Sequence, residues 1–225
     1  MVAPATLFVT GTDTGVGKTL VSVALLRHYA AAGVSATGFK PVASGAVRSP
    51  QGLRNDDALA LLAASAPDVA YDELNPYCFE PPIAPHLAAR EADVRIEPGR
   101  LDAAYRNLAR RHERIVVEGA GGWLVPLDEC LSFGDWAASH PWPVLLVVAM
   151  RLGCINHALL SAEAITRRTS LCGWVANVVP PAPERLEQNI ETLRDRMPAP
   201  LLGTISAGAA PQQTGAVARA IAGVL

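Results

Sequence analysis

The stretch from Thr10 to Thr19, which reads Thr-Gly-Thr-Asp-Thr-Gly-Val-Gly-Lys-Thr, constrains the fold more than any other part of the chain. A short apolar run at 6–9 leads into it, and an amphipathic run at 20–32 follows it. The order strand, glycine-rich turn, helix is typical of a phosphate-binding loop, in which backbone N–H groups and a helix N-terminus surround an anion. Lys18 would then neutralise phosphate charge, and the Thr19 hydroxyl would bind Mg²⁺.

This loop departs from the standard spacing at one position. Thr12 stands where the first glycine is expected, and Gly11 comes one residue too early. The alternative interpretation is a glycine-rich turn that does no more than cap a helix. Because Gly-Lys-Thr falls at the strand-to-helix junction, where phosphate binding requires it, we favour the nucleotide site.

Length and composition predict a single domain that spans residues 1–225. Half of the residues are hydrophobic, which is enough for a large core, and the net charge of −2 gives no support to non-specific nucleic-acid binding. No apolar run reaches membrane-spanning length, and no basic segment followed by an apolar one suggests a signal peptide. The four scattered cysteines favour free thiols in a reducing compartment, so we expect a cytoplasmic protein.

The distribution of lysine is a sharper signal. Of the 19 basic residues, only Lys18 and Lys40 are lysines. Lysine carries a compact point charge that fits a crowded phosphate site, whereas arginine is a wide planar fork. Lys40 ends a predicted strand, and ligands of open α/β sheets gather at the carboxyl ends of strands. Lys40 is therefore a candidate for the same site as Lys18, the alternative being a solvated lysine.

Apolar runs that alternate with helical patterns continue along the whole chain. They predict an α/β fold with a parallel β-sheet flanked by helices on both faces, a three-layer arrangement like that of P-loop NTPases. We expect residues 49–55 to form a loop, and we interpret 66–85 as an irregular excursion and a candidate wall of the substrate pocket. The predicted strands are 6–9, 36–40, 114–118, 143–149, 172–179 and 201–205, and the predicted helices are 18–32, 58–64, 101–111, 154–168, 182–196 and 212–224.

Two acidic segments supply three candidate magnesium ligands. Asp56 and Asp57 begin a predicted helix, where carboxylates serve either as caps or as metal ligands, and spacing does not decide between the two roles. Glu118 ends a buried strand before Gly119-Ala120-Gly121-Gly122, which has the form of a Walker B element. The alternative for Glu118 is a strand end followed by a glycine turn.

Two further positions are less specific. Asn177 lies near the end of a predicted strand, where its amide can pair with an adenine edge or merely stabilise a turn. The predicted helix that begins near Cys154 presents another N-terminus at the end of a strand, which is a candidate anion-binding site. We assign a structural role to His157 in its first turn.

Six stretches in one order resemble the motifs of the ATP-dependent dethiobiotin synthetase family, and they spread from about residue 6 to residue 203. The resemblance also explains the unusual loop, because this family's phosphate loop has the same spacing. The stretches are Gly11–Thr19, Lys40–Gly45, Gly52–Ala58, Val117–Gly122, Leu152–His157 and Gly173–Asn177.

The resemblance implies a ligase that forms C–N bonds in biotin biosynthesis. The family joins CO₂ to 7,8-diaminononanoate with ATP hydrolysis, through a carbamate and a mixed carbamic-phosphoric anhydride, and releases dethiobiotin, ADP and phosphate. It works with Mg²⁺ as a homodimer whose substrate site lies at the subunit interface.

The resemblance also assigns roles to individual residues. Lys40, Lys18 and Thr14 would be catalytic, and Thr19, Asp57 and Glu118 would hold Mg²⁺. The diamine or its carbamate would contact Thr14, Lys40 and Ser44, and its carboxylate would bind Gly153, Cys154 and Asn156 of the neighbouring subunit. The nucleotide would contact Gly15, Val16, Gly17, Lys18, Thr19, Asp57, Glu118, Gly119, Ala120, Gly121, Asn177, Ser206, Ala207 and Gly208.

The chain departs from the family pattern in two places. Ile205-Ser-Ala-Gly208 replaces the common Ile-Pro-x-Leu stretch beside adenine, which leaves base preference open, and Ala84-Pro-His86 replaces Ser-Pro-His.

Three rival classes of protein each conflict with a feature of the sequence or of the class itself. Partition and cell-division regulators carry a lysine early in the loop where this chain has Asp13, and a basic amphipathic C-terminal helix for membrane docking is missing from the sequence. A corrin-ring amidase would need a further glutaminase domain. A degenerate nucleotide-binding protein conflicts with the intact Lys18, Thr19, Lys40 and Glu118.

Overall fold

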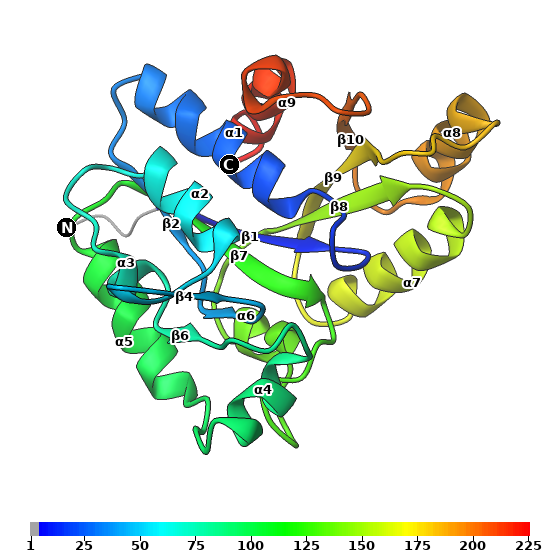
Figure 1. The fold of residues 1–225 in the computed structure, drawn as a ribbon. Helices are drawn as coiled ribbons and strands as arrows, with labels where there is room; N and C mark the ends of the chain where they lie inside the picture. The colour runs from blue at the N-terminus through cyan, green and yellow to red at the C-terminus, as the bar shows by residue number, and fades with distance from the viewer. Residues whose placement is uncertain (1–4) are drawn as a thin grey trace.

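A parallel sheet forms the centre of the computed structural model, which describes residues 5–225 (Figure 1). The first four positions of the predicted domain lie outside this range. Within it, the central sheet has six strands in the order β10-β9-β8-β1-β7-β2, all paired in parallel, so the predicted fold class is confirmed. The strands are β1 (Ala5–Gly11), β2 (Ala36–Phe39), β7 (Arg114–Gly122), β8 (Val144–Met150), β9 (Leu171–Val178) and β10 (Leu201–Ile205).

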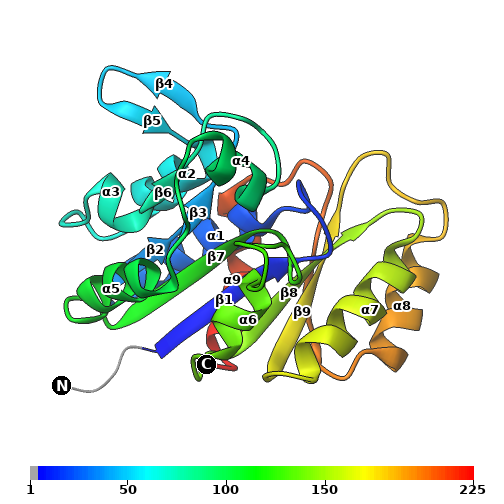
Figure 2. The same ribbon diagram turned by 90° about the horizontal axis from the view of Figure 1, so that it is seen from below.

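Helices cover both faces of this sheet (Figures 1 and 2). One face carries α1 (Lys18–Ala31), α2 (Asp56–Ala64) and α9 (Gly215–Ala222), and α1 contacts both of the others. The opposite face carries α5 (Pro98–Ala109), α6 (Phe133–Ala138) and α7 (Cys154–Thr166), with α8 (Leu186–Arg196) packed against α7. The short helices are α3 (Tyr71–Leu74), α4 (Pro85–Glu91) and the 3₁₀ turn η1 (Pro211–Thr214).

The central strands are apolar because both of their faces are covered. All seven residues of β8 are buried, as expected for an inner strand of a parallel sheet. On the face under α6, the ring of Phe8 meets Trp123, Phe133 and Trp136 at centroid distances of 5.9–6.5 Å. Along residues 5–225, no helix combines the length and the apolar character needed to cross a membrane.

The register of three neighbouring strands brings the predicted site residues together. Strand β7 lies between β1 and β2, with Val117 opposite Phe39 and Glu118 opposite Val9. Lys40 directly follows the last residue of β2, so it lies beside Glu118. Both residues therefore reach the edge of the sheet where β1 enters the phosphate loop.

Three sequence expectations differ from the structure. Strand β7 does not end at Glu118 but continues to Gly122, which pairs with Gly11, because glycines let the two backbones stay close. The expected loop 49–55 is mostly an exposed hairpin of β4 (Val47–Ser49) and β5 (Gly52–Arg54), which projects from the body of the protein in Figure 2. The turn that joins them ends at Gly52, whose φ of 104° suits glycine.

The excursion at 66–85 also contains regular structure. It holds α3 and the strand β6 (Tyr77–Cys78), which pairs with β3 (Val42–Ala43). Two residues a strand are too few to show the alternation by which strands are recognised in a sequence.

Candidate active site

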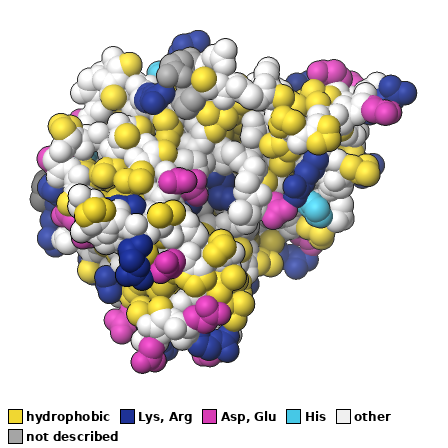
Figure 3. Space-filling view, viewed as in Figure 1, with side chains coloured by type: hydrophobic (Ala, Val, Ile, Leu, Met, Phe, Trp, Pro, Cys, Tyr) yellow, Lys and Arg dark blue, Asp and Glu magenta, His cyan; other side chains and the backbone are white. Residues whose placement is uncertain are grey.

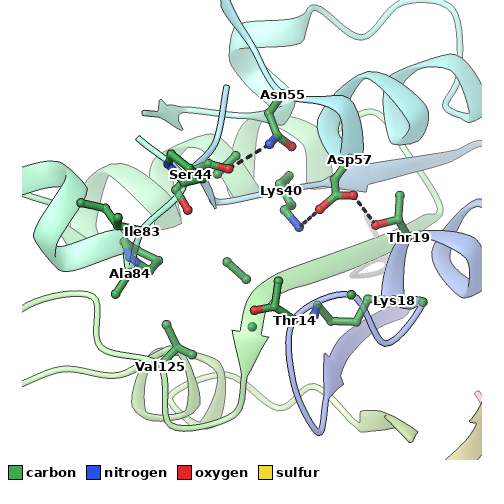
Figure 4. Close-up of a pocket in the computed structure, with 17 residues that line it drawn as sticks. Thr14, Lys18, Thr19, Lys40, Ser44, Asn55, Asp57, Ile83, Ala84 and Val125 are labelled. Carbon is green, nitrogen blue, oxygen red and sulfur yellow. Dashed lines mark hydrogen bonds and ion pairs between the residues drawn. The ribbon is translucent and has the colours of Figure 1, made fainter. Parts of the chain in front are cut away.

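A cavity of about 620 Å³ lies at the carboxyl ends of β1, β2 and β7. In Figure 4, Thr14 and Lys18 enter it from the phosphate loop, Lys40 and Asp57 from the opposite side, and Ile83, Ala84 and Val125 close the remaining wall. Figure 3 shows the protein in the view of Figure 1, and acidic and basic side chains lie side by side near the centre of this face. The lining residues are Thr14, Gly15, Gly17, Lys18, Thr19, Lys40, Ala43, Ser44, Asn55, Asp57, Pro82, Ile83, Ala84, Pro85, Ala120, Gly121 and Val125.

The phosphate loop has the conformation that anion binding requires. Gly17, directly before α1, has φ 96°, and a Cβ there would lie 2.2 Å from Nδ2 of Asn177. Only glycine tolerates both conditions. The helix that follows carries Lys18 in its first turn and aims its free N–H groups at the loop.

Lys18 is held inside the loop rather than in solvent. The residue is 6% exposed, and its Nζ donates a hydrogen bond to the backbone oxygen of Asp13 at 3.1 Å. Burial, followed by the charge of Lys40, lowers the pKa of Lys18 from 10.5 to about 8. An anion such as a nucleotide phosphate would relieve this unfavourable environment.

A second cluster joins Lys40 to two carboxylates. Lys40 Nζ donates to Glu118 Oε1 at 2.7 Å, to Asp57 Oδ2 at 3.0 Å and to the Gly119 carbonyl at 3.3 Å. The Thr19 hydroxyl bridges the same carboxylates, at 2.7 Å from Asp57 and 2.9 Å from Glu118. Residues from four separate segments of the chain thus meet at one point.

The charges of this cluster determine its protonation. Burial lowers the pKa of Lys40, but the carboxylates of Glu118 and Asp57 outweigh it and raise the pKa above 10.5. Burial raises the pKa of Asp57, but Lys40 and the Thr19 hydroxyl outweigh it and hold the pKa below 3.8. Both partners are therefore ionised at neutral pH.

The oxygen atoms of this cluster fit a magnesium ion. Glu118 is 0% exposed, and its Oε2 atom is buried with no hydrogen-bond partner in residues 5–225. An unpaired carboxylate oxygen in the interior is costly unless a ligand completes it. Across the same residues, His, Cys, Asp and Glu form no cluster of three that could hold a metal, and Mg²⁺ needs only one or two carboxylates beside nucleotide phosphates.

The remaining residues predicted from the loop and from β7 lie in or around the cavity. Gly15, Ala120, Gly121 and Ser44 line it, and Gly119 contacts Lys40. Val16 is buried and Asn177 donates from Nδ2 to its carbonyl oxygen at 2.8 Å, which ties the end of β9 to the loop.

Two predicted groups lie outside the cavity. Gly153, Cys154 and Asn156 belong to the start of α7 and do not line it; Asn156 is exposed. Ser206, Ala207 and Gly208 follow β10 and line a separate hollow of about 350 Å³. Ile205 pairs with Asn177, so this hollow lies beside the same end of the sheet.

Sequence reasoning missed several residues that shape the site. Asn55 caps α2 through Ala58 N–H and donates to the Ser44 carbonyl at 3.1 Å, so it positions Asp57 and Ser44 together. An asparagine before a helix is a recognisable cap signal.

Asn75 is buried and donates to the Lys40 carbonyl at 2.7 Å, a contact with no local signal. Pro82, Ile83 and Ala84 confirm the excursion as a cavity wall.

Comparison with known proteins identifies the family. The family model described as an AAA domain matches residues 5–210. A protein of Pseudomonas paraeruginosa named ATP-dependent dethiobiotin synthetase is 55% identical over 200 residues, which cover 88% of each chain. A protein of the same name from Aromatoleum aromaticum is 48% identical over 97% of this chain and 99% of its own. This chain belongs to the ATP-dependent dethiobiotin synthetase family.

Solved structures relate this dethiobiotin synthetase family member to a wider fold. A ParA family ATPase from Chlorobium tepidum has a TM-score of 0.59 at 14% identity and covers 97% of this chain and 98% of its own. MinD in complex with Mg-ADP from Pyrococcus horikoshii has a TM-score of 0.55 at 14% identity and covers 96% and 86%. At this level of identity the likeness shows a shared P-loop NTPase-like fold.

Proposed function

We propose that the protein is an ATP-dependent dethiobiotin synthetase that joins CO₂ to 7,8-diaminononanoate and releases dethiobiotin, ADP and phosphate. The observation that carries this proposal is the meeting of Lys18, Lys40 and the Thr19–Asp57–Glu118 cluster in one cavity at the phosphate loop. Relatives with this name at about half identity support it. The reaction is a ring-closing ligation that forms C–N bonds.

The chemistry needs positioned cations more than a nucleophilic side chain. One substrate amine attacks CO₂ and loses a proton, which gives a carbamate. A carbamate oxygen attacks the γ-phosphorus as ADP leaves, and the second amine then attacks the carbonyl carbon, loses a proton and expels phosphate. Negative charge develops on carbamate and phosphoryl oxygens, where Lys18 and Lys40 would stabilise it. Thr14 and Ser44 would hold the carbamate and the diamine.

Thr19, Asp57 and Glu118 would hold Mg²⁺ in this proposal. The metal would neutralise phosphate charge during transfer. Glu118 Oε2 is buried and has no hydrogen-bond partner among residues 5–225, which supports the assignment, because a bound cation would stabilise this buried oxygen. Lys40 would remain beside both acids as the cation nearest the carbamate.

The nucleotide would lie along the loop and the glycine stretch of β7. Gly15, Val16, Gly17 and Lys18 would surround the phosphates, and Gly119, Ala120 and Gly121 would allow close approach from the other side. Asn177 would read the base, and Ser206, Ala207 and Gly208 would border it. The position of Asn177 against the loop supports this arrangement.

We further propose that two copies share each substrate site. Gly153, Cys154 and Asn156 lie outside their own cavity, as expected of residues that bind the substrate carboxylate of a partner. Leu124, Leu152 and Leu160 near them are 57%, 97% and 57% exposed, and an apolar hollow lies between residues 122–126 and α7. Exposed apolar surface of this kind is typical of a protein interface.

The scattered cysteines favour a cytoplasmic location.

The proposed reaction is tested by measuring phosphate release from MgATP with and without the diamine and bicarbonate. Release that requires both, with an equal amount of dethiobiotin detected by mass, is the expected result. Steady hydrolysis that is indifferent to the diamine would instead indicate a regulatory ATPase.

The role of Lys40 makes a separate prediction. Lys40→Gln should lower kcat by about 100-fold or more, because a preorganised charge at the site of transfer is lost. The dissociation constant for ATP should change far less, since Lys18 and the loop remain. Steady-state kinetics and nucleotide titration measure the two effects; equal losses would refute a role in the attack.

A further inference from the structure

An ion pair joins the phosphate loop to the turn before α7. Arg151 Nη2 donates to Asp13 Oδ2, across 138 positions of the chain. Arg151 follows β8 directly, and its carbonyl oxygen accepts a hydrogen bond from Cys154 N–H at 3.0 Å as α7 begins. The pair therefore connects the loop to the helix start that we propose binds the partner's substrate.

Asp13 also contacts two active-site residues. Its Oδ1 accepts a hydrogen bond from Thr14 N–H at 2.7 Å, and its backbone oxygen accepts one from Lys18 Nζ at 3.1 Å. Thr14 and Lys18 both line the cavity. Any rotation of the Asp13 peptide would move both groups at once.

The pair contributes little to the stability of the fold. The side chains of Asp13 and Arg151 are 49% and 44% exposed, and ion pairs at this exposure have small effects on unfolding. The pair thus adds orientation to a loop that the backbone already holds through Thr12 N–H and Val147 O at 3.0 Å.

We propose that Arg151 is a positioning residue: its ion pair with Asp13 orients the outer turn of the phosphate loop so that Thr14 and Lys18 are aligned for carbamate phosphorylation. This inference rests on the proposed function and adds a pair of residues to it. Displacement of reacting groups by about 1 Å can cost on the order of 100-fold in rate, so a weak exposed contact can matter for turnover.

The test compares three substitutions in the full-length protein. Arg151→Gln removes the charge, Arg151→Lys keeps it, and Asp13→Asn keeps an oxygen for Thr14 N–H but removes the charge that Arg151 binds. Diamine-dependent phosphate release should fall about tenfold in kcat for Arg151→Gln and Asp13→Asn and by no more than about twofold for Arg151→Lys. The midpoint of thermal unfolding should shift by no more than about 4 °C in each case.

The double variant Asp13→Asn/Arg151→Gln decides whether the two residues act together. It should lose no more activity than either single variant, because one pair can be broken only once. Arg167→Gln is the matched control, since it removes another exposed ion pair, with Glu163, at the far end of α7. We expect wild-type kcat for it.

Three outcomes would overturn the inference. They are additive losses in the double variant, unchanged kcat in both single variants, and a rise in diamine KM for Arg151→Gln alone, which would indicate direct contact with the substrate. Failure of the proposed function is distinct, because the unmodified protein would then show no diamine-dependent phosphate release.

Discussion

The contact between Lys40 and Glu118 predicts a measurable loss of stability when the cation is removed. Lys40 is 2% exposed and Glu118 0%, and Nζ lies 2.7 Å from Oε1. At an effective dielectric constant of about 20, two unit charges at this separation attract by about 6 kcal/mol. The cost of burying both charges offsets part of this. Removing one partner of a buried pair typically costs about 3–5 kcal/mol, and we expect about 4 kcal/mol for Lys40→Met.

Urea unfolding, followed by the fluorescence of the buried Trp136 and Trp174, measures this loss. In a chain of this length, about 4 kcal/mol corresponds to a fall in Tm of about 8–16 °C. The double variant Lys40→Met/Glu118→Gln should recover about 2 kcal/mol of the loss, because the fully buried unpaired charge is gone and the other partner of Lys40, Asp57, is half-exposed. Wild-type stability in Lys40→Met, or additive losses in the double variant, would refute the account.

Three other substitutions test separate parts of the structure. Gly17→Ala should weaken nucleotide binding at least tenfold, on the order of 1.4 kcal/mol or more, because residue 17 has φ 96° and its Cβ would clash with Asn177. Calorimetric titration measures the affinity, and Gly99→Ala is the control, since open space surrounds Gly99. Asn156→Ala should raise the diamine KM about tenfold and leave ATP affinity unchanged; unaltered diamine kinetics would refute the shared site. Burial lowers the pKa of His112 below 6.5, so as the pH falls the unfolded chain binds this proton at a higher pH than the folded protein does. The free energy of unfolding therefore decreases as the pH drops below 6.5. In urea unfolding, His112→Gln should lose less stability than the unmodified protein between about pH 7 and about pH 5.

Much of the site was predictable because its signals are local. The loop at 10–19 carries its glycines, lysine and threonine in consecutive positions, and Lys40 stands out because the chain contains one other lysine. An apolar run precedes the loop and a short strand precedes Lys40, so the carboxyl ends of both strands could be placed at one edge of a parallel sheet.

The unpredicted parts depend on contacts between distant segments. Asn75 donates a hydrogen bond to the Lys40 carbonyl across 35 positions of the chain, and no sequence pattern near either residue predicts this contact. No residue in the strands of the hairpin at 47–54 is buried, and Val47 and Leu53 are their only large apolar residues, so the hairpin lacks the apolar alternation of a buried strand. Continuation of β7 past Glu118 depends on pairing of Gly122 with Gly11, which no pattern within β7 encodes.

The placement of Asn156 outside its own cavity has a consequence for mixed dimers. In the dimer that we propose, each site takes Lys40 from one subunit and Asn156 from the other. A mixed dimer of a Lys40→Gln chain and an Asn156→Ala chain would gather both lesions in one site and leave the second site intact. Mixing the two variants would therefore restore sites that contain both Lys40 and Asn156, and the restored activity would show the diamine KM of the unmodified protein.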